Sequence, residues 1–95
     1  ARLAPDLALR DVAGLLRSFD YAAAVAGLTG DAAQVWVADA RGALLTGYGL
    51  VDDPAGALLL RALELDKTLY EAVYEARNRP TWTHIPQAGL ARLLA

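Results

Sequence analysis

The hydrophobic and polar positions of this 95-residue chain repeat at helical rather than strand spacing. From Asp6 to about Ala26, successive apolar positions are three, one, three, three and four residues apart, as on one face of a helix. They are Leu9, Val12, Ala13, Leu16, Phe19 and Ala23. Residues 1–5 read as a lead-in that stops at Pro5, and Asp6 is a candidate cap. The pattern predicts a first helix that buries this face.

A second helix is predicted from Asp31, as its cap, to about Tyr48, after a short connection over residues 27–30. Its apolar members are Val35, Val37 and either Leu44 or Leu45. Gly42 lies in its middle and weakens it, because glycine costs about 1 kcal/mol relative to alanine inside a helix.

The strongest helical pattern runs from the acidic cap and proline at residues 52–54 to about Arg79. Its predicted core stripe is Leu59, Leu63, Leu69 and Val73. Pro80 ends this helix, because the residue before a proline is disfavoured in the helical conformation. Residues 81–86 are expected to be extended, and a short last helix is expected over residues 87–94.

Strand signals are nearly absent, because β-branched residues are few and alternation does not persist. The prediction is an all-α fold of three main helices plus a short C-terminal helix, with residues 1–95 forming a single helical segment. The hydrophobic fraction of 56% exceeds the usual range of about 45–50%. Together with the absence of methionine, it suggests an excised piece that exposes a face which a larger partner covers.

The composition also argues against several kinds of chemistry. A net charge of -2 speaks against nucleic acid and polybasic membrane binding, and the lack of cysteine excludes disulfides and thiolate zinc sites. A single histidine, His84, argues against a histidine-based metal site. No apolar run has the length of a membrane span and no leader opens the chain, so a cytoplasmic protein without membrane partners is expected.

Candidate chemistry gathers at the end of the third predicted helix. Lys67, Tyr70, Tyr74 and Arg77 share one helical face. Two acidic side chains lie beside that face, and two further groups follow Pro80; these are Glu71, Glu75, Trp82 and His84. Carboxylates and guanidinium groups bind hydroxyls, and aromatic rings cover the apolar side of a sugar ring. The pattern is therefore typical of a sugar-binding surface.

Packing alone can also account for these residues. Tyrosines four residues apart often only pack, glutamate–arginine pairs are usually solvated, and Trp82 can simply cover the helix end. His84 fits a surface histidine better than a general base. The sequence has no glycine-rich phosphate loop and no Asp-x-Asp pair, so these 95 residues alone lack the groups that transfer a phosphate.

Two stretches resemble one enzyme family. Residues 10–23 read RDVAGLLRSFDYAA and residues 63–80 read LELDKTLYEAVYEARNRP, followed by Trp82 and Ile85-Pro86. Both are similar to the C-terminal region of bacterial maltokinases, which are sugar kinases with a fold similar to aminoglycoside phosphotransferases and protein kinases. Glucosamine kinases and trehalose synthase–maltokinase fusions look similar here. The resemblance covers nearly the whole chain.

The resemblance implies that the chain is part of the C-terminal lobe of a larger kinase that phosphorylates maltose to maltose 1-phosphate, for glycogen or α-glucan synthesis. ATP and Mg²⁺ would be held by the remainder of that kinase, its N-terminal cap and ATP-binding lobe, and this segment alone would bind neither. The residues that match the family's acceptor-pocket signature are Tyr74, Glu75, Arg77 and Trp82, with Glu71 close behind.

The resemblance also gives Asp11 a role. It matches the aspartate that, in kinase-like folds, holds the backbone of the catalytic loop without transferring a proton. That role implies that the Arg10–Asp11 pair faces inward. Two alternatives stay open: a stand-alone helical interaction module without catalytic activity, and the equivalent segment of a glucosamine kinase.

Overall fold

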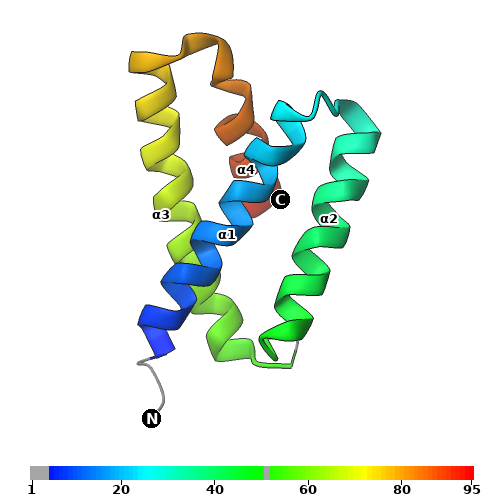
Figure 1. Ribbon diagram of the computed structural model, residues 1–95. Helices are drawn as coiled ribbons and strands as arrows, with labels where there is room; N and C mark the ends of the chain where they lie inside the picture. The colour runs from blue at the N-terminus through cyan, green and yellow to red at the C-terminus, as the bar shows by residue number, and fades with distance from the viewer. Residues whose placement is uncertain (1–4, 51) are drawn as a thin grey trace.

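In the described part of the chain, four α-helices run alternately up and down, with one 3₁₀ turn before the last (Figure 1). They are α1 (Pro5–Val25), α2 (Gly30–Gly47), α3 (Pro54–Asn78), the turn η1 (Pro80–Trp82) and α4 (His84–Leu94). This computed structural model describes residues 5–50 and 52–95, so residues 1–4 of the predicted lead-in lie outside it. Pro5, expected to end that lead-in, is the first residue of α1, and Asp6, the expected cap, lies inside the helix. The predicted all-α fold, with three main helices and a short C-terminal one, is confirmed.

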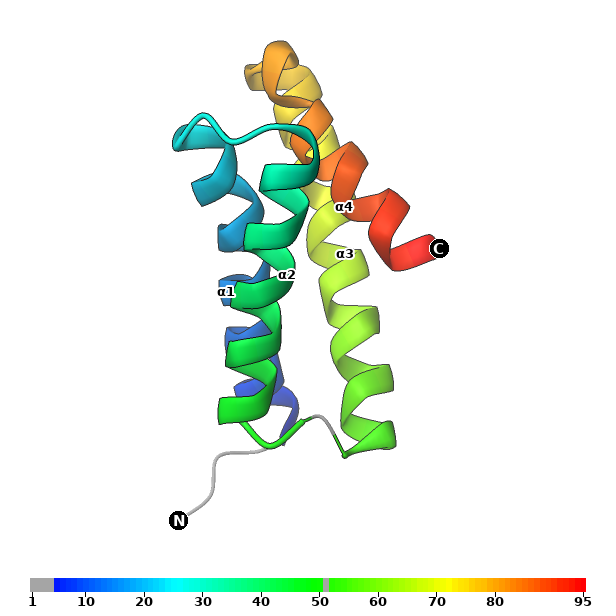
Figure 2. The ribbon, with the colours of Figure 1, turned by 90° about the vertical axis from the view of Figure 1, so that its right-hand side faces the viewer.

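Helix α1 lies between α2 and α3, and α4 returns alongside α3 (Figures 1 and 2). The predicted apolar face of α1 forms most of the core. Its buried residues are Leu9, Val12, Ala13, Leu16 and Ala23. Leu60 of α3 joins this core, and half-buried side chains from three elements close it. Those are Phe19, Leu44, Leu45, Leu50 and Leu63. The unmixed apolar pattern of α1 therefore predicted its burial correctly.

Glycines end both α1 and α2 by the same hydrogen-bond pattern. Gly27 has φ +80° and Gly49 has φ +70°, in the left-handed region that costs other residues steric strain. At the end of α1, Leu28 N–H donates to the Ala23 carbonyl and Gly27 N–H to Ala24. Residues 45–50 repeat these two bonds at the end of α2. Both helices thus end in a Schellman motif that satisfies their last carbonyls.

Helix α2 departs from its prediction in two places. Val35 is 61% exposed whereas Val37 is buried, because two residues turn a helix through about 200° and so place them on opposite faces. The N-cap position is Thr29, so Asp31 lies inside the first turn rather than at the cap. Gly42 does not interrupt the helix, which is continuous from Gly30 to Gly47.

Helix α3 buries a different face from the predicted one. Its Asp53 cap is confirmed, with a side-chain oxygen accepting from Gly56 N–H at 3.0 Å. Of the predicted stripe, only Leu63 packs against the core; Leu59, Leu69 and Val73 are 39–52% exposed. The buried positions are Leu60, Glu64, Thr68 and Glu75. The inward face of α3 is therefore largely polar, and its outward face is apolar.

The stretch that was expected to be extended, residues 81–86, is helical. Pro80 begins η1 and Pro86 is the third residue of α4. Proline is tolerated at both places, because N–H groups in the first turn have no partner within the helix. Helix α4 therefore starts at His84, three residues before the predicted start. Among the described helices, none is long and apolar enough to span a membrane.

Replacing Leu16 with alanine is expected to lower the free energy of unfolding by about 2–5 kcal/mol, because Leu16 is fully buried and leaves a cavity. Leu58→Ala is the matched control, since Leu58 is 71% exposed and should change stability by less than about 0.5 kcal/mol. Urea unfolding followed by circular dichroism measures both. Equal losses in the two variants would contradict the assigned core.

Candidate functional site

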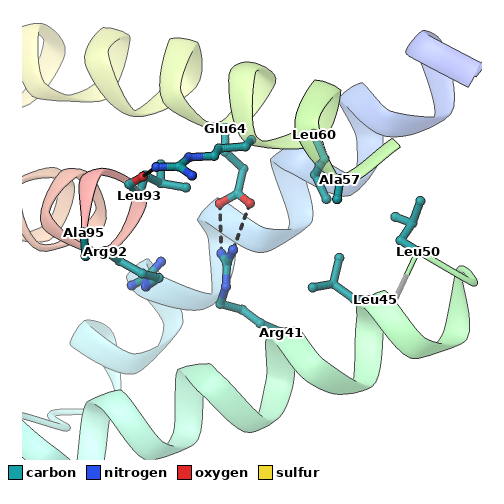
Figure 3. A pocket seen from close by; sticks show the side chains of 10 residues that line it. Arg41, Leu45, Leu50, Ala57, Leu60, Glu64, Arg92, Leu93 and Ala95 are labelled. Atoms are coloured by element: carbon teal, nitrogen blue, oxygen red, sulfur yellow. Dashed lines mark hydrogen bonds and ion pairs between the residues drawn. The ribbon is translucent and has the colours of Figure 1, made fainter. Parts of the chain in front are cut away.

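Glutamates on the inward face of α3 are paired with arginines from neighbouring helices. Glu64 is 2% exposed, and both of its carboxylate oxygens accept hydrogen bonds of 2.9 Å from Arg41 of α2. Figure 3 shows this pair spanning the space between α2 and α3, and both side chains line a cavity of about 260 Å³. Because an isolated buried carboxylate is costly, Arg41 is what allows Glu64 to be buried at this position.

Arg17 of α1 joins three helices. Its guanidinium donates to both oxygens of Glu71 on α3 at 2.7–3.1 Å and also pairs with Asp20 on its own helix. Arg92 of α4 donates to the other oxygen of Asp20 at 2.8 Å. Burial alone would lower the pKa of Arg17, but the hydrogen bond and charge of Glu71, with the charge of Asp20, outweigh it and raise the pKa. The guanidinium therefore stays charged.

Gly89 lets α4 approach this ion-pair group. A Cβ at Gly89 would lie 2.6 Å from Nη1 of Arg17, closer than real Cβ contacts. That nitrogen is held by Asp20 and cannot swing away without breaking the pair. A side chain at this position would therefore push α4 away from α1.

A second group lies at the C-terminal end of α3. Glu75 is 1% exposed and accepts 2.6 Å from the Tyr21 hydroxyl and 2.8 Å from two nitrogens of Arg79. The Arg79 hydrogen bonds hold the pKa of Glu75 below its ordinary value, against the opposing effect of burial. Burial, reinforced by the bond to Glu75, raises the pKa of Tyr21. The phenol is therefore a neutral donor to an ionised carboxylate.

Arg79 in turn orders the aromatic side chains at this end. Its guanidinium lies 4.2 Å from the centre of the Trp82 ring and 5.7 Å from that of Tyr74. Tyr74 stacks on Tyr70, with ring centres 6.5 Å apart. Trp82 also faces Tyr21 across 6.1 Å. The result is a partly exposed aromatic surface built on a fixed cation, which a neutral ring ligand can cover.

The structure divides the sequence-predicted acceptor residues into two sets. Glu71 and Glu75 face inward and pair with Arg17, Tyr21 and Arg79. Tyr74 and Arg77 are exposed and Trp82 is half-buried. Glu75, Tyr74 and Trp82 come together through Arg79, whereas Arg77 makes no ion pair or side-chain hydrogen bond within residues 5–50 and 52–95.

The predicted inward orientation of Arg10 and Asp11 is wrong for this chain. Both are exposed, and within the part of the chain that the structure describes Asp11 has no side-chain hydrogen bond or ion pair. Val12 and Phe19 are seven residues apart, or about two helical turns, and both lie on the face of α1 that packs on the core. Asp11 lies on the opposite face. The inward-facing charged pair of α1 is instead Arg17 and Asp20.

Sequence reasoning missed several residues that hold the site together, among them Arg17, Asp20, Tyr21 and Arg41. Asp20 carried a usable signal, because it follows Leu16 by four residues and so belongs to the core face. Arg41 carried none, since its glutamate is 23 residues away in sequence. His84 is exposed with Nδ1 3.0 Å from the Thr81 carbonyl oxygen, which agrees with a surface histidine.

Comparison with known proteins relates the chain to sugar kinases. A glucosamine kinase from Mycolicibacterium smegmatis is 36% identical over 107 residues, which cover 99% of this chain and 26% of that protein. The chain thus spans about a quarter of the length of that kinase. No protein-family model matches. The resemblance to sugar kinases noted from the sequence is supported at this level, and this relative is a glucosamine kinase.

Glu75→Gln is expected to flatten the acid side of the stability profile. Because the pKa of Glu75 is depressed by folding, its carboxylate stabilises the fold above its ordinary pKa of about 4.5 and loses that effect as the pH falls below it. Between neutral pH and pH about 3, the unfolding free energy should therefore fall less steeply with pH in the variant. The difference in slope should correspond to the uptake of at most about one proton on unfolding. An unchanged slope would contradict the assigned ion pair.

Proposed function

We propose that this chain is part of the C-terminal lobe of an ATP-dependent sugar kinase, where it contributes to acceptor binding and supports the catalytic loop. The observation that carries the proposal is 36% identity to a glucosamine kinase along 99% of the chain. That similarity favours glucosamine as the acceptor, and maltose is the second candidate because of the maltokinase-like stretches. The reaction would move the γ-phosphate of ATP to a sugar hydroxyl.

The aromatic surface at the end of α3 supports the acceptor role. Tyr74 and Trp82 offer ring faces, and Arg79 between them is already neutralised by Glu75. Arg77 is an exposed donor three residues after Tyr74, and it would complete the set with a hydrogen bond to a hydroxyl. Glu71 and Glu75 would not contact the sugar but would support the surface by holding α1 against α3.

The outward face of α1 supports the second role. Asp11 and Leu15 are four residues apart on this face, and both are exposed, Leu15 at 42%. A carboxylate beside an apolar side chain can accept backbone N–H groups of a loop that packs on it. The exposure of Asp11 therefore fits contact with the remainder of the kinase, which would carry the catalytic loop.

ATP and Mg²⁺ would be bound by that remainder. Within the described residues, no group of three or more histidine, cysteine, aspartate or glutamate side chains is placed to hold a metal ion. In this proposal the part of this chain in the reaction is to position the acceptor and the catalytic loop.

In the longer protein that contains this chain, Trp82→Ala should raise the KM for glucosamine by about tenfold and leave the KM for ATP unchanged. The loss of one ring face from the acceptor is worth about 1–2 kcal/mol. Leu58→Ala is the control, because Leu58 is 71% exposed near the start of α3, at the opposite end of that helix from Trp82. Coupled ATPase kinetics with glucosamine and with maltose also determine the acceptor. Equal changes in both KM values would reject the acceptor assignment.

Asp11→Asn should lower kcat with little change in either KM, because a weaker hold on the catalytic loop affects turnover rather than ground-state binding. The circular dichroism spectrum of the variant should match that of the unmodified protein, since Asp11 is exposed. Unchanged turnover would exclude the supporting role. Absence of phosphorylation of any sugar by the unmodified longer protein would instead reject the kinase proposal itself.

A further inference from the structure

The outward face of α3 carries an apolar group with one charge at each end. Leu69, Tyr70 and Val73 are 51%, 72% and 52% exposed, and all three lie opposite the buried glutamates. Asp66 precedes them and Arg77 follows them, both exposed. These five residues are called the outward stripe. Figure 1 shows α3 at the edge of the bundle, with no described element on that side.

The charges at the two ends share the face of the apolar residues. Asp66 and Arg77 are eleven residues apart, which is about three helical turns, so their side chains project in nearly the same direction. Neither is engaged in an ion pair within the described ranges 5–50 and 52–95. The stripe is thus negative at its N-terminal end, apolar in the middle and positive at its C-terminal end.

Because the two ends of the stripe carry opposite charges, the stripe is complementary to a second copy of itself in antiparallel orientation. When a second identical helix is laid antiparallel on the stripe, with the two-fold axis midway between Tyr70 and Val73, each Asp66 meets the Arg77 of the other copy. In the same register, Tyr70 of each copy meets Val73 of the other. A two-fold interface repeats every contact, so both ion pairs form and the apolar residues between them are covered.

We infer that the outward stripe is an association surface for a second copy of this chain, which pairs through α3 in antiparallel orientation. A single helix pair buries less area than a standard stable interface, so the association is a weak and reversible one. The surface lies on α3, whereas Asp11 belongs to α1. Arg77 belongs to both this surface and the proposed acceptor set, so sugar and second copy would compete for it.

Charge reversal tests the pairing on the 95-residue chain, without sugar. Sedimentation velocity over micromolar to millimolar concentrations should show a monomer–dimer equilibrium. Asp66→Arg and Arg77→Asp should each weaken dimerisation by at least about tenfold, because both attractive pairs become repulsive. An equimolar mixture of the two variants should recover the dimer, since every pair is then again of opposite charge.

Asp39→Arg is the matched control, because it makes the same change in net charge as Asp66→Arg at an exposed position of α2. It should dimerise as the unmodified chain does. A chain that stays monomeric at all concentrations would overturn the inference and leave the stripe to the rest of a longer protein. Dimerisation that is insensitive to both reversals, or no recovery in the mixture, would equally overturn it. Circular dichroism of each variant verifies that the helices are intact.

Discussion

The burial of glutamates on the inward face of α3 is the constraint on which the rest of the structure depends. Glu64, Glu71 and Glu75 face arginines from α2, α1 and the end of α3 itself. Charged groups leave water at a cost of several kcal/mol each, so they can be buried here only with their partners in place. The positions of α1 and α2 around α3 are thus set by ion pairs as well as by the apolar core.

The same pairs connect the core to the candidate site. Glu75 joins Tyr21 of α1 to Arg79, and Arg79 lies against Trp82 and Tyr74. The buried carboxylate of Glu75 therefore holds in place, through Arg79, the aromatic surface that is proposed to bind a sugar. Glu71 and Arg17 brace the next turn of α3 against α1 and, through Asp20 and Arg92, against α4. The contacts that pack the helices together are therefore the same ones that position the side chains of the candidate site.

The face of α1 could be predicted from the sequence, and the faces of α3 could not. In α1 the buried positions are mostly apolar, so hydrophobic spacing identifies them. In α3 the buried positions include two glutamates and a threonine, and leucines, tyrosines and valine lie outside, so the same rule selects the wrong side. The correct face depends on arginines that are 23 and 54 residues away in sequence.

The candidate site follows the same division. Residue types at the end of α3 indicated the aromatic and charged surface, but nothing local distinguished the inward Glu71 and Glu75 from the outward Tyr74 and Arg77. Asp11 was expected to face inward because of its resemblance to a buried aspartate, but it is exposed because it lies on the side of α1 away from the apolar face. The last helix was predicted, but the 3₁₀ turn at Pro80 and the first residues of α4 were not, because proline is tolerated in a first turn as well as being a helix breaker.

The most direct test of this account is a double-mutant cycle on Arg17 and Glu71, with unfolding free energies measured in urea. Arg17→Met leaves Glu71 without its arginine and Asp20 with Arg92 alone, and it should cost about 3–5 kcal/mol. Adding Glu71→Gln to that variant should recover at least about 1 kcal/mol, because it removes one of the uncompensated charges. A loss below about 0.5 kcal/mol in the single variant, or exact additivity in the double variant, would contradict it.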